Sequence, residues 1–153
     1  MVPMFHDVPI DCINQAVENY AVPASLIMAI IFVEGGKNGL ASSNRNGTYD
    51  YGVMQINSVW LPQIYSQFGY DRYDLQYDPC KNVDAGTWIL KQNLLNNYKQ
   101  PLMRIIGDYH SHTPNLNYIY SVQVLSAYQT IQKMFGKPSN PCNASGQICS
   151  NAD

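Results

Sequence analysis

The sequence predicts a single, mainly α-helical domain of residues 1–136 followed by a polar tail, residues 137–153. The chain has 153 residues, which is enough for one well-filled hydrophobic core and too few for two. Apolar side chains recur at helical spacing through most of it, and prolines and glycines separate the periodic segments. The alternation typical of strands is weak, so we expect at most a short β element around residues 49–56.

Two helices are expected in the first part of the chain. Pro9 precedes the first, residues 10–20, whose apolar side chains share one face. Pro23 precedes the second, residues 24 to about 34, which ends at a pair of glycines. The second segment is apolar nearly all round, so we expect this helix to be buried.

The middle of the chain combines a long loop with two further helices. Residues 37–51 are rich in Asn, Ser, Gly and Thr and show neither helical nor strand periodicity. Loops of this length are usually functional or mobile. A short helix is expected within residues 58–68, closed by Gly69. Asp78 and Pro79 have the residue types of a helix start, and the periodic pattern continues to about Tyr98.

Two helices are expected in the last part of the folded region. The first runs from Pro101 to about residue 109. The second is the longest, from Pro114 until Gly136 stops it, and we expect a face at helical spacing to be packed inward. That expected face contains Tyr118, Val122, Leu125, Tyr128 and either Ile131 or Gln132.

Composition limits the classes of partner. Charged residues make up 13% of the sequence and the net charge is -2, while Asn, Gln and Tyr are abundant. Nucleic-acid binding needs clustered Lys and Arg, which the sequence lacks, so we expect no nucleic-acid partner. No apolar run approaches the roughly 20 residues of a spanning helix, so we expect no membrane insertion. We expect a monomer without a cofactor.

Four cysteines bear on the compartment in which the protein acts. An even number in a small domain is compatible with two disulfides and an oxidising compartment. Spacing alone allows three pairings; we favour Cys12 with Cys80 in the folded part and Cys142 with Cys149 in the tail. The N-terminus lacks the pattern of a secretory signal, so a signal either was removed or never existed. We expect a periplasmic or otherwise exported protein.

Glu34 is the first candidate catalytic residue. It ends the apolar helix and precedes the glycine pair, which we expect to let a substrate approach closely. Burial and the negative end of the helix dipole both disfavour the charged carboxylate, so we expect a raised pKa. A carboxyl group that stays protonated near neutral pH can donate a proton to a leaving oxygen. The alternative is a solvated glutamate at a fraying helix end.

Asp50 is the candidate for a second carboxylate. An acid that cleaves a glycosidic bond normally works with a second carboxylate, which acts as nucleophile or as base for water. Asp50 ends the polar loop just before residues 51–57, where it can face the same cleft as Glu34. The alternatives are a turn or capping role for Asp50, and Asp108 as a more remote second carboxylate.

Four short motifs follow one another in an order and spacing that resemble a known family. They are IIFVEGG at 30–36, GVMQIN at 52–57, NVDAGTWIL at 82–90 and YHS at 109–111. Together they resemble the soluble lytic transglycosylase (SLT) domain of the lysozyme-like superfamily, over roughly residues 12–132. The nearest resemblance is to the small transglycosylases that accompany type III and type IV secretion, conjugation and pilus systems.

The resemblance implies a lysozyme-like helical fold, of the goose-type or transglycosylase kind, and an activity on peptidoglycan. Glu34 matches the catalytic glutamate, which protonates the oxygen of the β-1,4 bond between N-acetylmuramic acid and N-acetylglucosamine. The same residue then removes the proton of the muramic C6 hydroxyl, which closes a 1,6-anhydro ring. The acetamido group of the substrate stabilises the intermediate, so no protein nucleophile is needed. Such enzymes are expected to open local gaps in the cell wall for a secretion, conjugation or pilus apparatus.

The resemblance also implies residues that bind the substrate. Gly52, Met54, Gln55 and Asn57 match the motif that lines the cleft. The Gln55 amide is expected to hold the acetamido group of the sugar, and Gly52 is expected to leave room for the ring. Tyr109 matches a motif tyrosine whose hydroxyl is expected to orient the catalytic acid.

Two departures from the family pattern concern residues close to the expected site. Many members have serine after the catalytic glutamate, where this chain has Gly35, so an orienting hydroxyl is missing. The usual Ala-Tyr-Asn-Ala-Gly is replaced by Asp-Tyr-His-Ser-His at 108–112, which resembles the secretion-associated branch. His110 is expected to line the cleft or the surface. His110 and His112 lack a third convincing ligand, so we expect no metal site.

Two alternative functions remain open at this point. If Asp50 faces Glu34, the protein can be a goose-type, lysozyme-like muramidase that hydrolyses the same bond with both carboxylates. The second alternative is a non-catalytic, glycan-binding component of a secretion machine, which would keep the cleft and lose the acid. The presence of Glu34 within a complete set of motifs favours an enzyme.

Overall fold

The computed structural model describes residues 2–135, and within them the fold is mainly α-helical, as predicted. Five of the helices agree with the sequence-based expectations to within about two residues. A sixth, expected within residues 58–68, begins as a 3₁₀ turn. The helices are α1 (Ile10–Tyr20), α2 (Ala24–Glu34), η1 (Ser58–Trp60), α3 (Leu61–Phe68), α4 (Arg72–Tyr77), α5 (Pro79–Asn96), α6 (Leu102–Asp108) and α7 (Pro114–Phe135).

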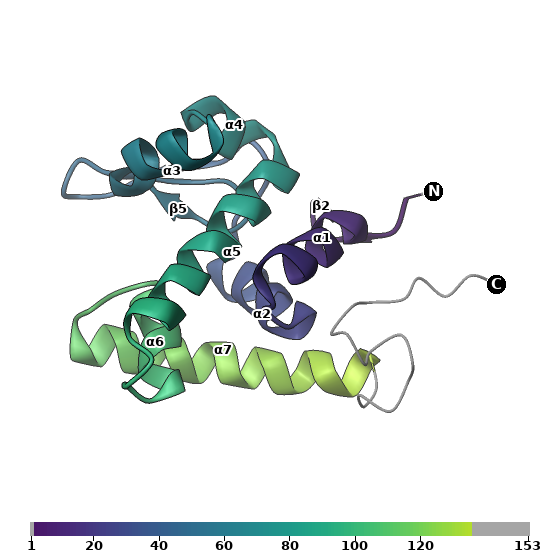
Figure 1. Ribbon diagram of the computed structural model, residues 1–153, viewed down its shortest axis with the longest axis vertical. Coiled ribbons are helices and arrows are strands. Elements are labelled where there is room, and N and C mark those ends of the chain that lie inside the picture. Colours follow the sequence, from purple (N-terminus) through teal and green to yellow (C-terminus); the bar gives the residue numbers. More distant parts are fainter. Residues whose placement is uncertain (1, 136–153) are drawn as a thin grey trace.

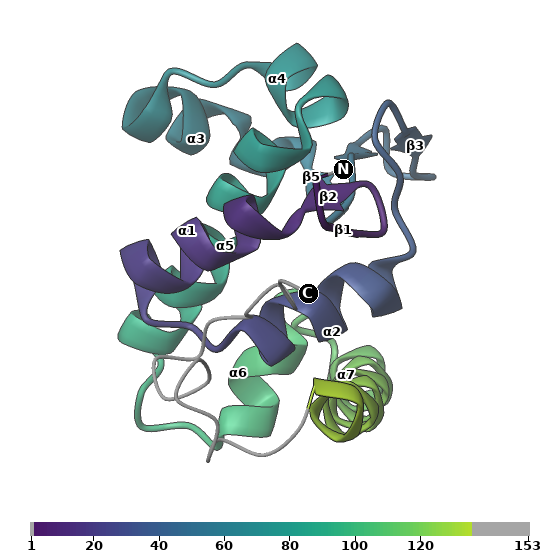
Figure 2. The same cartoon turned by 90° about the vertical axis from the view of Figure 1, so that its right-hand side faces the viewer.

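Helix α5 crosses the centre of the molecule and separates two groups of elements (Figure 1). Helices α3 and α4 and strand β5 (Ile56–Asn57) lie toward one end of α5, and α6 and α7 lie toward the other (Figures 1 and 2). Helix α1 packs against α5, and α2 packs against α7. This arrangement leaves the C-terminal end of α2 close to both groups of elements.

Helix α2 forms the centre of the hydrophobic core. Ile27, Met28, Ala29 and Ile30 are all fully buried, because neighbouring elements cover nearly the whole circumference of the helix. The expectation of complete burial is wrong at Phe32, whose side chain is 59% exposed. The helix is therefore buried through its middle and reaches the surface on one side near its end.

A small antiparallel sheet precedes the central helix. Its strands are β3 (Ala41–Ser43), β4 (Tyr49–Tyr51) and β5, in that order. The expected β element around residues 49–56 is confirmed, but the expectation of a loop without strands at 37–51 is wrong at β3. The turn that pairs β3 with β4 contains a bond from the Asn44 amide to the Thr48 carbonyl oxygen, at 2.8 Å. A second hairpin, β1 (Met4–Phe5) with β2 (Val8–Pro9), was also not predicted.

A disulfide connects α1 to the start of α5. It joins Cys12 to Cys80, with the Cα atoms 5.3 Å apart, and this predicted pairing is confirmed. The predicted pairing of Cys142 with Cys149 lies outside the described residues. Asp78 caps α5 by accepting hydrogen bonds from two backbone amides of its first turn, each at 3.0 Å.

The buried face of α7 differs from the predicted one. Its buried residues are Asn117, Tyr120, Ser121, Val124, Ala127 and Ile131. Ile131 of the expected face is buried, whereas Tyr118, Val122 and Leu125 are exposed, Tyr118 to 69%. The inward face includes polar side chains, so apolar periodicity selected the wrong side of this helix. No helix within residues 2–135 combines the length and hydrophobicity required to cross a bilayer.

Candidate active site

A cavity of about 600 Å³ lies where the end of α2, the β-sheet and the connection from α6 to α7 meet. We call it the Glu34 cavity. It brings together six of the eight residues predicted for catalysis or substrate binding, Glu34, Asp50, Gln55, Asn57, Tyr109 and His110, and also the alternative carboxylate Asp108. Gly52 and Met54 are not among its lining residues, and both are buried behind its wall.

Glu34 is the last residue of α2. Gly35 follows in the left-handed conformation, with φ of 63°, and its amide bonds to Ile31. The pKa of the Glu34 carboxyl is raised from 4.5 to about 7, mainly because burial disfavours the charged form. The negative charge of Asp50 adds to this rise, and the Tyr120 hydroxyl opposes it. The direction agrees with the sequence-based expectation, and a large fraction of Glu34 is protonated at neutral pH.

Tyr120 of α7 is a site residue that the sequence analysis missed. Its hydroxyl is buried and makes no hydrogen bond of ordinary length and angle within residues 2–135. It nevertheless lies close enough to Glu34 for each group to affect the pKa of the other. Its ring stacks with that of His110, at 4.9 Å between centroids, and with that of Tyr109, at 6.4 Å. The sequence signal that could have identified it was a tyrosine two residues after Tyr118, on the other side of the helix from the expected face.

Asp50 lies in β4 and is held by two side-chain amides. Asn57 Nδ2 donates to one carboxylate oxygen at 3.0 Å, and Asn44 Nδ2 donates to the other at 3.1 Å. The carbonyl oxygen of the Asn57 side chain accepts from the backbone amide of Val59, so Asn57 is itself fixed. Asp50 therefore faces the Glu34 cavity as an oriented carboxylate. Asn57 contributes to the site by fixing the position of Asp50.

Gln55 lines the cavity from a strained backbone position. Its φ is 49°, in the left-handed region that non-glycine residues rarely adopt. Its side-chain oxygen accepts from the Ser42 hydroxyl at 3.0 Å, and its nitrogen donates to the Gly52 carbonyl oxygen at 2.9 Å. Each end of the amide keeps one hydrogen-bonding position for a ligand, because an amide has two donors and two acceptor lone pairs.

Gly52 and Met54 support the wall of the cavity. Gly52 has φ of 68°, and a Cβ there would overlap the Asn82 side chain and the Leu75 carbonyl oxygen. Asn82 is fully buried; it donates to two backbone carbonyl oxygens and accepts from the Met54 amide at 2.9 Å. Gly52 is thus required by protein packing, which differs from the expected role of leaving room for a sugar ring.

The Tyr109 hydroxyl also contacts the wall. It donates to the Met54 carbonyl oxygen at 2.9 Å, so its proton is directed at the wall and not at Glu34, which the resemblance implied that it orients. Gly36 shows a similar difference between expectation and structure. A Cβ on Gly36 would overlap the Gly52 carbonyl oxygen, so this glycine is needed for contact with the neighbouring protein backbone. Gly35 faces open space.

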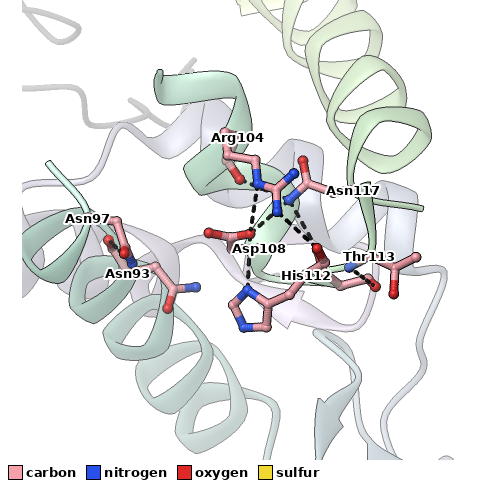
Figure 3. Close-up of polar contacts among 8 residues, drawn as sticks. Asn93, Asn97, Arg104, Asp108, His112, Thr113 and Asn117 are labelled. Carbon is pink, nitrogen blue, oxygen red and sulfur yellow. Dashed lines mark hydrogen bonds and ion pairs between the residues drawn. The ribbon is translucent and has the colours of Figure 1, made fainter. Parts of the chain in front are cut away.

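Asp108 is bound into a network that fixes the connection between α6 and α7 (Figure 3). Its side chain is only 5% exposed, and one oxygen accepts from Asn117 Nδ2 at 2.9 Å. The same oxygen lies 3.6 Å from Arg104 Nε and 3.2 Å from His112 Nδ1. Arg104 also donates to the His112 carbonyl oxygen at 2.9 Å. Asp108 therefore organises one wall of the cavity and is a poor candidate for a reacting carboxylate.

Comparison with known families agrees with this geometry. The family profile described as the transglycosylase SLT domain matches residues 11–140, which is most of the chain. The chain belongs to the transglycosylase SLT family. The mainly α-helical, lysozyme-like fold expected from the motifs is therefore confirmed.

Relatives of this SLT domain include proteins of Shigella, Salmonella and Escherichia coli. Protein IpgF of Shigella sonnei is 36% identical over 86 residues, which are 56% of this chain and 56% of IpgF. Invasion protein IagB of Salmonella typhi is 27% identical over 135 residues, covering 85% of this chain and 82% of IagB. A peptidoglycan-binding-like protein of Escherichia coli O157:H7 is 36% identical over 87 residues, or 52% of each chain. The match to IpgF thus spans little more than half of that relative.

The SLT site contains no cluster of side chains suited to a metal ion within residues 2–135. His110 stacks on Tyr120, and His112 contacts Asp108, so the two histidines of the His-x-His sequence have separate partners. Gly35 occupies the position of the usual serine and contributes no hydroxyl to the site. The acid has Tyr120 and Asp50 as its polar neighbours in place of that hydroxyl.

Proposed function

We propose that the protein is a peptidoglycan lytic transglycosylase with Glu34 as its catalytic acid and base. The observation that carries this proposal is the Glu34 carboxyl itself, which faces the cavity with a pKa raised to about 7 by burial. Membership of the SLT family supports peptidoglycan as the substrate. Asparagine, threonine and glutamine side chains around the acid suit the hydroxyl and acetamido groups of a glycan.

The reaction uses one protein carboxyl in two steps. Protonated Glu34 donates to the glycosidic oxygen as the bond from that oxygen to C1 of N-acetylmuramic acid breaks. The acetamido oxygen of the same sugar stabilises the developing positive charge at C1. The Glu34 carboxylate then accepts the proton of the C6 hydroxyl, whose oxygen bonds to C1 and closes the 1,6-anhydro ring. No water is consumed, and Glu34 returns to its protonated state.

The neighbours of Glu34 have supporting roles in this proposal. Tyr120 keeps water from one side of the carboxyl and places a hydroxyl beside it. Asp50, oriented by Asn44 and Asn57, supplies negative charge near the developing positive charge of the sugar. Gln55 offers its free amide positions to the acetamido group. His110 forms part of the cavity wall and stacks on Tyr120.

The proposed biological role is to open local gaps in the cell wall for a secretion, conjugation or pilus apparatus. The similarity to a protein named invasion protein IagB supports this role. The proposed compartment is the periplasm or another exported location, where peptidoglycan is accessible. The disulfide between Cys12 and Cys80 supports an oxidising compartment.

Product analysis tests the reaction. Purified peptidoglycan is digested with the wild-type protein, and the released muropeptides are examined by mass spectrometry. We expect 1,6-anhydro ends from the wild-type protein and no product from Glu34→Gln. The control is Glu18→Gln, which replaces the only other glutamate of the chain, on the exposed side of α1, and should give the wild-type products. Full activity of Glu34→Gln would exclude the proposed role of Glu34.

A hydrolase is the second candidate because Asp50 and Glu34 line the same cavity and interact electrostatically. In that reaction Asp50 acts as nucleophile or as base for a water molecule. Reducing ends in place of anhydro ends, together with complete loss of activity in Asp50→Asn, would favour the hydrolase. Sugar binding without release of any muropeptide would favour a non-catalytic component.

A further inference from the structure

A second hollow, of about 630 Å³, lies next to the Glu34 cavity and has no role in the chemistry described above. Its walls come from the end of η1, from α3 and from α5, so we call it the α3–α5 pocket. Two tryptophans, Trp60 and Trp88, line it together with five side-chain amides, a serine and a proline. None of its lining residues carries a charge.

We propose that the α3–α5 pocket binds a neutral, N-acetylated sugar of a glycan strand whose reacting bond lies at Glu34. This inference rests on the proposed function. The pocket is then a distal binding site that makes the protein select long glycan strands over short ones. Its residues add affinity for the strand and take no part in bond cleavage.

The chemistry of the lining favours a sugar over other occupants. An indole ring provides a flat apolar surface for the face of a sugar ring, and side-chain amides offer donors and acceptors for hydroxyl and acetamido groups. A phosphate or a peptide carboxylate buried in this pocket would find no cation to pair with. A purely apolar ligand would leave the five amides without partners. Only a neutral ligand with many polar groups meets both conditions.

The tryptophans are held in fixed orientations. The rings of Trp60 and Trp88 meet edge to face, at 6.3 Å between centroids and 85° between planes. Trp88 makes a second edge-to-face contact with Phe68, at 5.7 Å. Both indoles are partly buried against the core, so they keep these positions without a ligand. A preformed aromatic surface of this kind loses little conformational entropy on binding.

The position of the pocket connects it to the reaction site. Trp60 and Asn93 line both the α3–α5 pocket and the Glu34 cavity, so the two hollows meet at these residues. One extended ligand can therefore occupy both hollows, with Trp60 between them. A disaccharide seated at Glu34 fills only the Glu34 cavity, whereas a longer strand fills both hollows, so chain length is the variable to test.

The sequence provides a direct reporter for this pocket. Trp60 and Trp88 are the only tryptophans of the chain; both line the pocket and Trp60 also lines the Glu34 cavity, so emission reports a ligand in either hollow. We propose to titrate the full-length Glu34→Gln protein, which cannot turn over, with chitobiose and with chitohexaose. We expect saturable changes in emission with chitohexaose and an affinity for chitobiose that is weaker by about tenfold or more.

Substitutions of one amide from α3 and one from α5 give the decisive comparison. Replacing both Gln63 and Gln92 by alanine removes two pocket amides, which corresponds to about a tenfold loss of affinity at roughly 0.7 kcal/mol each. We expect this loss for chitohexaose and no change for chitobiose. Gln129→Ala, an exposed amide on α7 outside the pocket, is the matched control and is expected to change neither affinity.

The outcomes separate this inference from the proposed function. Unchanged chitohexaose affinity in the double variant, or no response of tryptophan emission to chitohexaose, overturns the pocket assignment. If wild-type protein still releases anhydro-muropeptides in that case, the transglycosylase proposal stands without the pocket. A length-dependent affinity that the double variant abolishes supports the pocket, even if the muropeptide assay rejects the transglycosylase reaction.

Discussion

Replacing Glu34 by glutamine is expected to stabilise the protein above neutral pH and to leave its stability nearly unchanged in acid. The pKa of this carboxyl is about 7 in the folded protein and 4.5 when it is free in solution. Between these values the unfolded chain has lost the proton while the folded protein retains it. The free energy of unfolding therefore decreases as pH rises through this window. A glutamine side chain has a similar shape and does not titrate.

The size of the effect follows from the two pKa values. The difference between 4.5 and about 7 corresponds to roughly 3 kcal/mol of unfolding free energy at full ionisation. This is an upper limit, because the cavity is open and water reduces the cost of charging the carboxyl. We expect Glu34→Gln to match wild type below pH 4.5 and to exceed it by up to about 3 kcal/mol above pH 7.

Urea denaturation followed by far-ultraviolet circular dichroism measures this difference at both pH values. Glu18→Gln is the matched control, since Glu18 is exposed on α1 and is the only other glutamate. We expect the control to follow wild type at both pH values. If the advantage of Glu34→Gln is the same in acid and in alkali, the carboxyl is not desolvated by folding. The argument for a protonated catalytic acid would then fail.

Three further predictions concern the framework of the site. Asp108→Ala should lower the free energy of unfolding by about 1–2 kcal/mol, because the Asn117 amide loses an acceptor and the partly exposed Arg104 loses its ion pair; a thermal midpoint equal to that of wild type would contradict this. Replacing Cys12 and Cys80 by alanine should cost about 4 kcal/mol in urea denaturation, given a closed loop of 68 residues; a cost below about 1 kcal/mol would exclude this loop-entropy account. Gly36→Ala should abolish muropeptide release and lower stability, since its Cβ would overlap a backbone oxygen; unchanged activity would refute that packing.

Sequence periodicity predicted the helices whose boundaries carry strong local signals. Proline before the first helical turn and glycine after the last one set the ends of α2 within one residue. Helix α4 was missed because six residues are too few to show a helical period. Its start is instead specified by reciprocal bonds between Asp71 and Asp74, an Asp-x-x-Asp version of the capping box. Strand β3 was missed because Ala-Ser-Ser has no apolar alternation, and its pairing depends on the adjacent turn.

Residues of the candidate site were predicted where the residue type itself suggests chemistry. They were missed where membership of the site depends on which face of a helix packs inward. Glu34 and Asp50 were found because a carboxyl beside apolar or turn residues is visible in the sequence. Tyr120 was missed because α7 turns a partly polar face inward, and apolar periodicity cannot identify such a face. The partner of the Tyr109 hydroxyl, the Met54 carbonyl oxygen, depends on a contact across 55 residues of chain. No local pattern encodes that choice.

The disulfide between α1 and α5 crosslinks the chain that carries one part of the site and leaves the other part outside the closed loop. The loop that it closes contains Glu34, Asp50 and Gln55, whereas Tyr109 and Tyr120 come from chain beyond Cys80. Detachment of α6 and α7 would thus expose the acid and lower its pKa while leaving the rest of the cavity wall crosslinked. Amide protons of α6 and α7 should exchange with solvent at a lower free energy than those of α5. The raised pKa that Glu34 needs to act as an acid therefore depends on α6 and α7 remaining packed against the rest of the domain.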